Sequence, residues 1–228
     1  MVNRRKKIGI VSTGQTPRVD IVPEMRKLWG PDIEVIQAGA LDGIGLEEVQ
    51  QKYAPEKSRD VICTRMGDGS EVVVCKDLLV PGLQRSINLL SKKGADVLLL
   101  VCTGRFPRFT SSKPLIKAQE VFDHMVTALH QEGKKIALIV PVERQIEPMK
   151  KRFKHLKGEL VGYAYSPYES EEDLVSTAKK LKKENVYFTV MHCMGYTMRM
   201  QKKLVEITGR PALLARSVVA RAVKEFMV

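Results

Sequence analysis

The sequence predicts an α/β fold of two pseudo-symmetric lobes, each built on a parallel sheet. Two apolar runs, VLLLVCTGRF at Val97–Phe106 and VYFTVMHCMGY at Val186–Tyr196, contain buried-strand patterns without polar alternation. Such runs are typical of parallel strands that are covered on both faces. In addition, the opening KKIGIV of Lys6–Val11 returns as KKIALIV at Lys134–Val140. Each half therefore begins with a similar strand and later presents a strand followed by Cys-x-Gly.

This weak internal repeat sets the expected domain organisation. We predict a first lobe of residues 1–107 plus 215–228 and a second lobe of residues 115–214. The loop-like run RFPRFTSSKP at Arg105–Pro114 lies near the middle of the chain. It can serve as a lobe boundary, as a lid, or as both. Sites on such folds often lie between lobes, which is where we expect this one.

The first strand, Lys6–Ser12, leads into a turn of small and polar residues, Ser12–Thr16. Pro17 suits the first position of a helix with Thr16 as its N-cap, so we predict a helix over Pro17–Trp29. Backbone amides gather at such a turn, which is typical of an anion site. Arg18 would oppose the dipole of this helix, and a residue placed against a local rule indicates a function. Its planar guanidinium suits a carboxylate.

The remaining elements of the first lobe alternate in the same way. A strand at Ile33–Ala38 and a helix at Leu46–Tyr53 precede a β-hairpin insertion, Asp60–Met66 and Glu71–Cys75, at the edge of the lobe. We expect the hairpin to give the sheet an antiparallel edge. A helix over Asp77–Lys93, closed by Gly94, then leads to the strand before Cys102.

The second lobe repeats the alternation of strands and helices. We expect helices at 115–131, 143–155, 171–184, 196–208 and 216–227, and strands at 134–140, 159–164, 186–192 and 211–214. The last of these helices is expected to pack back on the first lobe.

Composition limits the classes of partner. The formal net charge is +12, with 38 Lys and Arg against 26 Asp and Glu, which favours anionic ligands. The basic residues are spread over most expected helices without interleaved aromatics, so a solvated surface explains them better than nucleic-acid binding. No apolar run approaches the roughly 20 residues that a membrane span needs, and the N-terminal apolar segment is too short for a signal peptide. We therefore expect a cytoplasmic protein with no membrane partner. The sequence leaves the oligomeric state open, and a homo-oligomer is possible.

The four cysteines show no metal-like clustering and are expected to be free thiols. Chemistry in open α/β sheets lies at the carboxyl ends of the strands, where Cys102 and Cys193 are expected. Removing a proton α to a carboxylate needs a base on one face and an acid on the other. A thiol can serve once its pKa falls below about 8.5, with no metal or cofactor. The predicted substrate-binding residues are Ser12, Thr13, Gln15, Arg18, Thr103, Gly104, Gly195 and Tyr196. For either thiol alone, packing in the core is the simpler interpretation.

Four stretches carry a family resemblance: IGIVSTGQTPRVD (Ile8–Asp20), KYAPE (Lys52–Glu56), IVPVE (Ile139–Glu143) and HCMGY (His192–Tyr196). They resemble the AroM family of bacterial proteins, a likeness that by itself implies no reaction. More remotely, the architecture is similar to the aspartate/glutamate/hydantoin racemase superfamily. That resemblance implies cofactor-independent racemisation, isomerisation or decarboxylation of a small carboxylic acid, with Cys102 and Cys193 as the two catalytic thiols.

Three departures from the superfamily pattern bear on this implication. Ser12-Thr13 stands in place of Asp-Ser, Thr103 in place of the Asn after the first cysteine, and Met194-Gly195 in place of Thr-His after the second. These differences weigh against amino-acid racemisation in particular. The alternative function is a non-catalytic small-molecule-binding or regulatory protein on the same fold. His192 precedes Cys193 and should point to the opposite face of its strand, as a structural residue.

Overall fold

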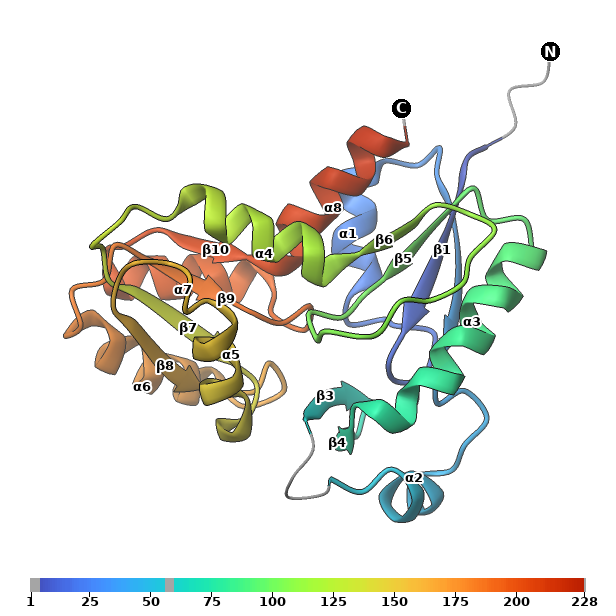
Figure 1. Cartoon of the computed structure of the whole chain (residues 1–228), viewed down its shortest axis with the longest axis horizontal. Coiled ribbons are helices and arrows are strands. Elements are labelled where there is room, and N and C mark those ends of the chain that lie inside the picture. The colour runs from blue at the N-terminus through green and yellow to red at the C-terminus, as the bar shows by residue number, and fades with distance from the viewer. Residues whose placement is uncertain (1–4, 56–59, 228) are drawn as a thin grey trace. The chain divides into compact units, whose positions relative to one another are not determined.

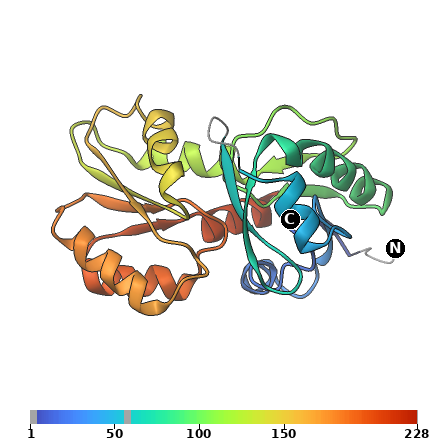
Figure 2. The same ribbon diagram turned by 90° about the horizontal axis from the view of Figure 1, so that it is seen from below.

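The computed structural model describes residues 5–55 and 60–227, so Glu56 of the KYAPE run lies outside the described residues. The chain forms two compact units (Figures 1 and 2). One comprises Met1–Glu120 with Ala220–Val228, and the other Val121–Val219. Each unit contains a four-stranded parallel sheet, which confirms the predicted fold class.

The sheet of the first unit has the strand order β2-β1-β5-β6. Its strands are β1 (Lys7–Ser12), β2 (Glu34–Gly39), β5 (Val97–Leu100) and β6 (Leu115–Lys117). The two central strands are buried along almost their whole length, as expected for apolar runs covered on both faces. Helix α3 (Val80–Lys92), preceded by the 3-10 turn Asp77–Leu79, packs against β1 and β2. The registers Ser12↔Gly39 and Val11↔Leu100 bring the carboxyl ends of these strands to one edge.

The sheet of the second unit has the order β10-β9-β7-β8. Its strands are β7 (Ile136–Val140), β8 (Leu160–Ala164), β9 (Phe188–Met191) and β10 (Ala212–Leu214). Written from β8, the order β8-β7-β9-β10 repeats β2-β1-β5-β6 of the first unit strand for strand. The KKI repeat of the sequence therefore falls on equivalent central strands, β1 and β7. The helices of this part of the chain include α5 (Ile146–Arg152), α6 (Glu171–Lys182) and α7 (Met198–Thr208).

The hairpin forms as predicted, from β3 (Val61–Arg65) and β4 (Glu71–Cys75), after the short helix α2 (Leu46–Lys52). The expectation that it gives the parallel sheet an antiparallel edge is wrong, because β3 and β4 make a separate two-stranded sheet. The physical reason lies in the turn after β1. The backbone N–H of Gln15 donates to the carbonyl of Arg65 at 3.0 Å, and the Thr13 hydroxyl donates to Thr64 at 3.0 Å. The hairpin is thus bonded to this turn.

The first helix also differs from the prediction. Helix α1 spans Val22–Trp29, and the Thr16–Pro17 peptide before it is cis. The carboxylate of Asp42 accepts hydrogen bonds from both the backbone N–H and the hydroxyl of Thr16. Thr16 is therefore held by the loop after β2 and does not cap a helix. Arg18 consequently lies before the helix, and the dipole reasoning applied to it does not hold.

A second difference lies at Leu115. The helix expected from this residue begins at Ala118, as α4 (Ala118–Leu129), because Leu115–Lys117 form the edge strand β6. The pairing begins where the N–H of Leu98 donates to the carbonyl of Pro114. Similarly, the helix expected over 143–155 is a 3-10 turn, Glu143–Gln145, followed by α5.

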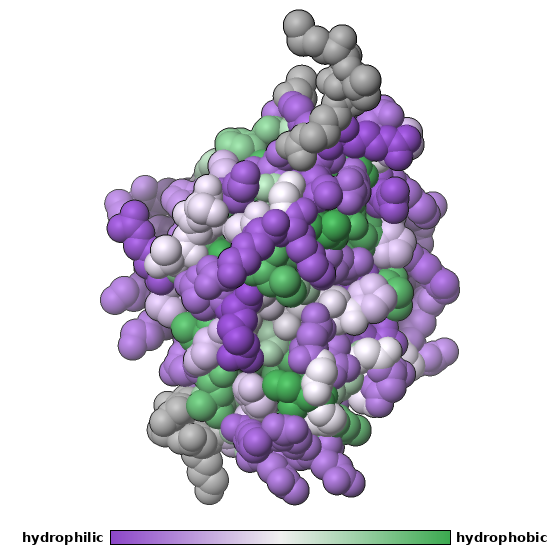
Figure 3. All heavy atoms as spheres, turned by 90° about the vertical axis from the view of Figure 1, so that its right-hand side faces the viewer, coloured by the Kyte–Doolittle hydropathy of each residue, from purple (hydrophilic) through white to green (hydrophobic). Residues whose placement is uncertain are grey.

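The final helix, α8 (Ala215–Phe226), contributes its later turns to the first unit. The indole N–H of Trp29 donates to the carbonyl of Ala220 at 2.9 Å, and Val223 is fully buried. The surface seen in Figure 3 is hydrophilic over most of its area, with hydrophobic residues in small separate patches. Among the described helices, none is long and apolar enough to cross a membrane.

Candidate functional site

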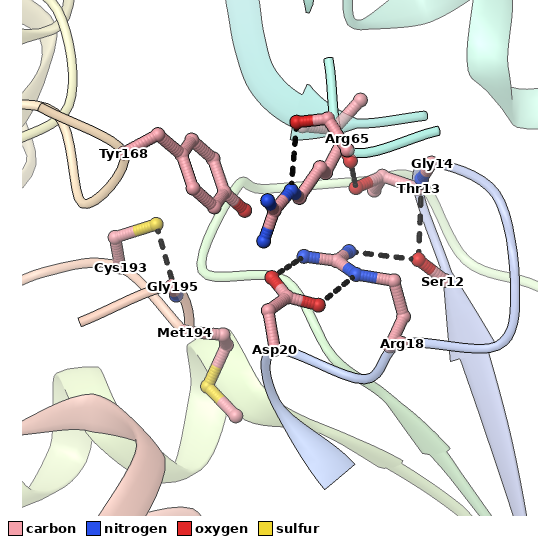
Figure 4. A network of polar contacts seen from close by, with 12 residues as sticks. Ser12, Thr13, Gly14, Arg18, Asp20, Arg65, Tyr168, Cys193, Met194 and Gly195 are labelled. Carbon is pink, nitrogen blue, oxygen red and sulfur yellow. Dashed lines mark hydrogen bonds and ion pairs between the residues drawn. The ribbon is translucent and has the colours of Figure 1, made fainter. Parts of the chain in front are cut away.

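Three strand ends carry the same local motif, in which a side chain accepts the N–H of the glycine two residues later. The acceptor is the Ser12 hydroxyl after β1, at 3.2 Å from the Gly14 nitrogen. After β5 and β9, the acceptor is the sulfur of Cys102 or Cys193, each 3.3 Å from the nitrogen of Gly104 or Gly195. Figure 4 shows the serine and the second cysteine motif. An N–H that points at a sulfur favours the thiolate over the thiol.

The two Cys-x-Gly turns also agree in what covers them. A Cβ added to Gly104 would lie 2.5 Å from the Ile62 side chain, and one added to Gly195 would lie 2.5 Å from Pro167. The same added atoms would lie 3.4 and 3.5 Å from the cysteine sulfurs. A side chain at Gly195 would collide with the rigid ring of Pro167, whereas at Gly104 the flexible end of Ile62 would have to move. Of the two predicted binding residues, Gly195 therefore has a firm packing reason for being glycine, and Gly104 a weaker one.

In the first unit, several predicted site residues gather at the carboxyl edge of one sheet. All four are buried, namely Ser12, Thr13, Cys102 and Thr103, and Cys102 is 9% exposed. They come from adjacent strands, since the N–H of Val101 donates to the carbonyl of Val11. This edge offers hydroxyls, one thiol and backbone amides. Cys193 and Gly195 occupy the corresponding place in the second unit, where Cys193 is half-buried.

Arg18 is bound to a carboxylate of the protein itself. Its Nε and Nη2 donate to the two oxygens of Asp20 at 2.9 and 2.7 Å, and Nη1 donates to the Ser12 hydroxyl at 3.0 Å (Figure 4). The two charged side chains are only 5% and 10% exposed. The fork therefore makes the bidentate pair for which guanidinium is suited, with Asp20 as the partner. The Arg-x-Asp spacing is the sequence signal for this pair.

Two other predicted binding residues have their polar groups bonded within the scaffold. The Gln15 amide donates to the carbonyls of Leu41 and Ile44 and accepts from the N–H of Gly67, which ties the loop after β2 to the hairpin turn. Tyr196 is fully buried, and its hydroxyl donates to the Tyr165 carbonyl at 2.6 Å. Both residues hold the turns in place.

Two arginines near these turns have no clear sequence signal. Arg65 ends β3, is partly buried, and donates from Nε to the Gly69 carbonyl at 2.9 Å; Figure 4 draws it with Arg18. Arg216 lies in the first turn of α8 and is 2% exposed. It donates to the carbonyls of Met194 and Gly195. Only tertiary structure brings Arg216 to the turn after Cys193.

His192 is buried away from solvent within the second unit. Its Nε2 lies 2.9 Å from Asp123, whose other oxygen is 3.7 Å from Arg152. The rings of Phe122 and Phe153 pack against the imidazole. Burial lowers the pKa of His192, against the opposing effect of Asp123. This environment fits the structural role expected from strand alternation. Within the described residues, no group of three or more His, Cys, Asp and Glu side chains is placed to hold a metal ion.

The depressed pKa of His192 predicts acid sensitivity. The unfolded chain takes up a proton near the ordinary value of 6.5 while the folded chain resists it, so the free energy of unfolding falls as the pH drops below about 6.5. We expect urea unfolding at pH 7.5 and 5.5 to show that the free energy of unfolding falls less between these two pH values in His192→Gln than in the wild type. His124→Gln, on the exposed side of α4, is the matched control. Equal losses in wild type and His192→Gln would contradict the assignment.

The fold and the site can be compared with known proteins. A family model described as AroM protein matches residues 8–227. Among solved structures, allantoin racemase from Klebsiella pneumoniae is 12% identical with a TM-score of 0.61, covering 97% of this chain and 87% of that one. Maleate isomerase Iso from Pseudomonas putida S16 is 12% identical with a TM-score of 0.64, covering 97% and 92%. Glutamate racemase from Aquifex pyrophilus is 15% identical with a TM-score of 0.58, covering 96% and 83%.

At these identities the solved structures show a shared fold, that of the aspartate and glutamate racemases. A comparison with curated protein sequences gives no match. The family model extends over nearly the whole chain, including both Cys-x-Gly turns. This chain therefore belongs to the AroM protein family.

Proposed function

We propose that the protein catalyses cofactor-independent proton transfer at the carbon α to a carboxylate, with Cys102 and Cys193 acting on the same small acid. The observation that carries this proposal is the repeated turn, in which equivalent strands of two equivalent sheets each present a sulfur with a backbone N–H on it. Proteins named as racemases, an isomerase and a decarboxylase share the fold. That similarity supports the reaction class without identifying the substrate.

In the proposed reaction, the thiolate of one cysteine accepts the α-proton, and the electron pair of the broken C–H bond delocalises into the carboxylate. The thiol of the other cysteine then donates its proton to the carbon, which leaves that sulfur as the thiolate. Proton count and charge are conserved. A decarboxylation would use only the donating half, with CO₂ leaving the carbon. Backbone amides and the hydroxyls of Thr13 and Thr103 are proposed to bind the carboxylate, with Arg18 supplying positive charge.

Deuterium exchange tests this proposal without knowledge of the true substrate. The protein is incubated in D₂O with a panel of amino, hydroxy and dicarboxylic acids, and α-deuterium is followed by NMR or mass spectrometry. We expect incorporation into at least one acid, because returning a solvent-derived proton needs no net product. A double Cys102→Ser, Cys193→Ser variant gives the background. Exchange at this background rate for every acid would contradict the proposal.

A non-catalytic binding protein is the second candidate, favoured by Asp20, which already neutralises Arg18. Acids that raise the melting temperature without any exchange would support it. The cytoplasmic location expected from the sequence remains a prediction under either function.

A further inference from the structure

A buried guanidinium and the Cys193 sulfur lie at opposite ends of one peptide group. Nε of Arg216 donates to the Met194 carbonyl at 2.9 Å. The N–H of the same peptide belongs to Gly195, whose nitrogen is 3.3 Å from the Cys193 sulfur. Nη2 of Arg216 donates to the next carbonyl, that of Gly195, at 2.8 Å. All four residues lie within the second unit.

The placement of Arg216 opposes a general rule of helix electrostatics. A cation near a helix N-terminus is unfavourable, yet Arg216 is the second residue of α8 and only 2% exposed. Two of the donors of its guanidinium bond to carbonyls of the Cys193 turn, those of Met194 and Gly195. Hydrogen bonds to a cation are among the strong ones. These two bonds therefore fix the conformation of the Cys193 turn from the side of its carbonyls.

A cation on the oxygen of a peptide group also changes the nitrogen end. It polarises the group, so the N–H becomes a stronger donor, and burial lessens the solvent screening of this effect. The acceptor here is a sulfur, whose charged form gains more from a strong donor than its neutral form does. The hydrogen-bonded series thus runs from the Arg216 guanidinium through the Met194–Gly195 peptide to the Cys193 sulfur.

We propose that Arg216 is a positioning residue that stabilises the thiolate of Cys193 through the Met194–Gly195 peptide. It acts without touching the substrate. The proposal deepens the proposed function and rests on it for the use made of the thiolate in catalysis. The effect on the sulfur itself can be measured whether or not the protein turns over an acid.

His192 precedes the turn and contacts Asp123, which in turn lies near Arg152. Tyr165 and Tyr196 belong to the core cluster against which Cys193 packs. Figure 4 draws Tyr168 with Cys193, and the neighbouring Glu169 accepts the N–H of Ser166. Burial lowers the pKa of His192, and burial followed by nearby acids raises the pKa of Tyr165 to about 12. Both are therefore neutral through the range in which a thiol ionises. Their neutrality makes the Cys193 profile a suitable report on Arg216.

The test is the pH profile of alkylation by iodoacetamide, followed for each cysteine by peptide mass spectrometry. Arg216→Met should raise the midpoint for Cys193 by about one pH unit and lower its alkylation rate at pH 7 roughly tenfold. Arg216→Lys keeps the charge without the fork and should give a smaller shift. Cys102 in the same protein should keep its profile. Arg221→Met, at an exposed position of the same helix, should leave both profiles unchanged.

An unchanged Cys193 midpoint in folded Arg216→Met would overturn the proposal, as would equal shifts of Cys102 and Cys193. If circular dichroism shows that Arg216→Met is unfolded, the Cys193 midpoints of Arg216→Lys and of the wild type are compared instead. In wild-type protein labelled with ¹⁵N-glycine, the Gly195 amide should titrate at the Cys193 midpoint, and an amide that does not titrate overturns the proposal. An Arg216-dependent midpoint without deuterium exchange would refute the proposed function and retain this one.

Discussion

Replacing Cys193 with serine is expected to lower α-deuterium exchange by at least about 100-fold, and Cys102→Ser should do the same. A serine hydroxyl is far too weak an acid to replace a thiol in proton transfer to and from carbon near neutral pH, although it fills nearly the same space and can accept the same glycine N–H. The measurement is the initial exchange rate, by NMR, for the acid that the panel identifies. Thermal melts of each variant confirm that it is folded.

Cys63→Ser is the matched control for these variants. Cys63 is a half-buried thiol on β3, and its sulfur lies 3.2 Å from a carboxylate oxygen of Glu71. Its replacement should leave the exchange rate unchanged. Loss of exchange in only one of the two site variants would indicate a single-base reaction, closer to decarboxylation than to racemisation. Full exchange in both would rule out thiol chemistry.

Arg18→Ala is expected to reduce the free energy of unfolding by about 3–5 kcal/mol, because it leaves the carboxylate of Asp20 buried without its bidentate partner. The pair is 5% and 10% exposed at the side chains, so water replaces the lost bonds poorly. Urea unfolding, followed by circular dichroism, measures the change. Removing both charges in Arg18→Met, Asp20→Asn should cost less than removing Arg18 alone.

Lys52→Ala tests the specificity of this effect. Lys52 and Glu48 form an exposed i,i+4 pair on α2, and exposed pairs contribute little. Its loss should not measurably change the unfolding midpoint. A destabilisation below about 1 kcal/mol for Arg18→Ala would contradict this prediction and show that the fold does not depend on the buried pair.

Most strands of the two parallel sheets could be predicted, because the central strands are rich in Val, Leu and Ile and are bounded by Gly-containing turns. Leu115–Lys117 could not, since a three-residue edge strand carries no usable periodicity and continues smoothly into the pattern of α4. The start of α1 was misplaced because Thr16 and Pro17 resemble a helix cap. The cap pattern is local, whereas the bond that holds Thr16 comes from Asp42, which is distant in the sequence and therefore gives no local signal.

The candidate site shows a similar division. The Cys-x-Gly repeat indicated both sulfurs and both glycines, because that signal is local. The sequence analysis expects Arg18 to be a cation at a helix N-terminus, but Arg18 lies before α1. The buried cation at a helix N-terminus is instead Arg216, in the first turn of α8. For Gln15 and Tyr196, substrate binding stays a prediction. Their bonds to the carbonyls of Leu41 and Tyr165 could not be predicted, because only the folded chain brings these groups together.

The contribution of α8 to the first unit has a consequence for how the protein is made. Residues 5–120 are synthesised long before Ala220. During synthesis the indole N–H of Trp29 therefore lacks the carbonyl to which it donates in the finished protein. The contacts of Val223 are missing at that stage too. The second unit is continuous in sequence, from Val121 to Val219, so all its residues have been synthesised before these last contacts of the first unit can form. The half that is synthesised first is therefore the half that is completed last.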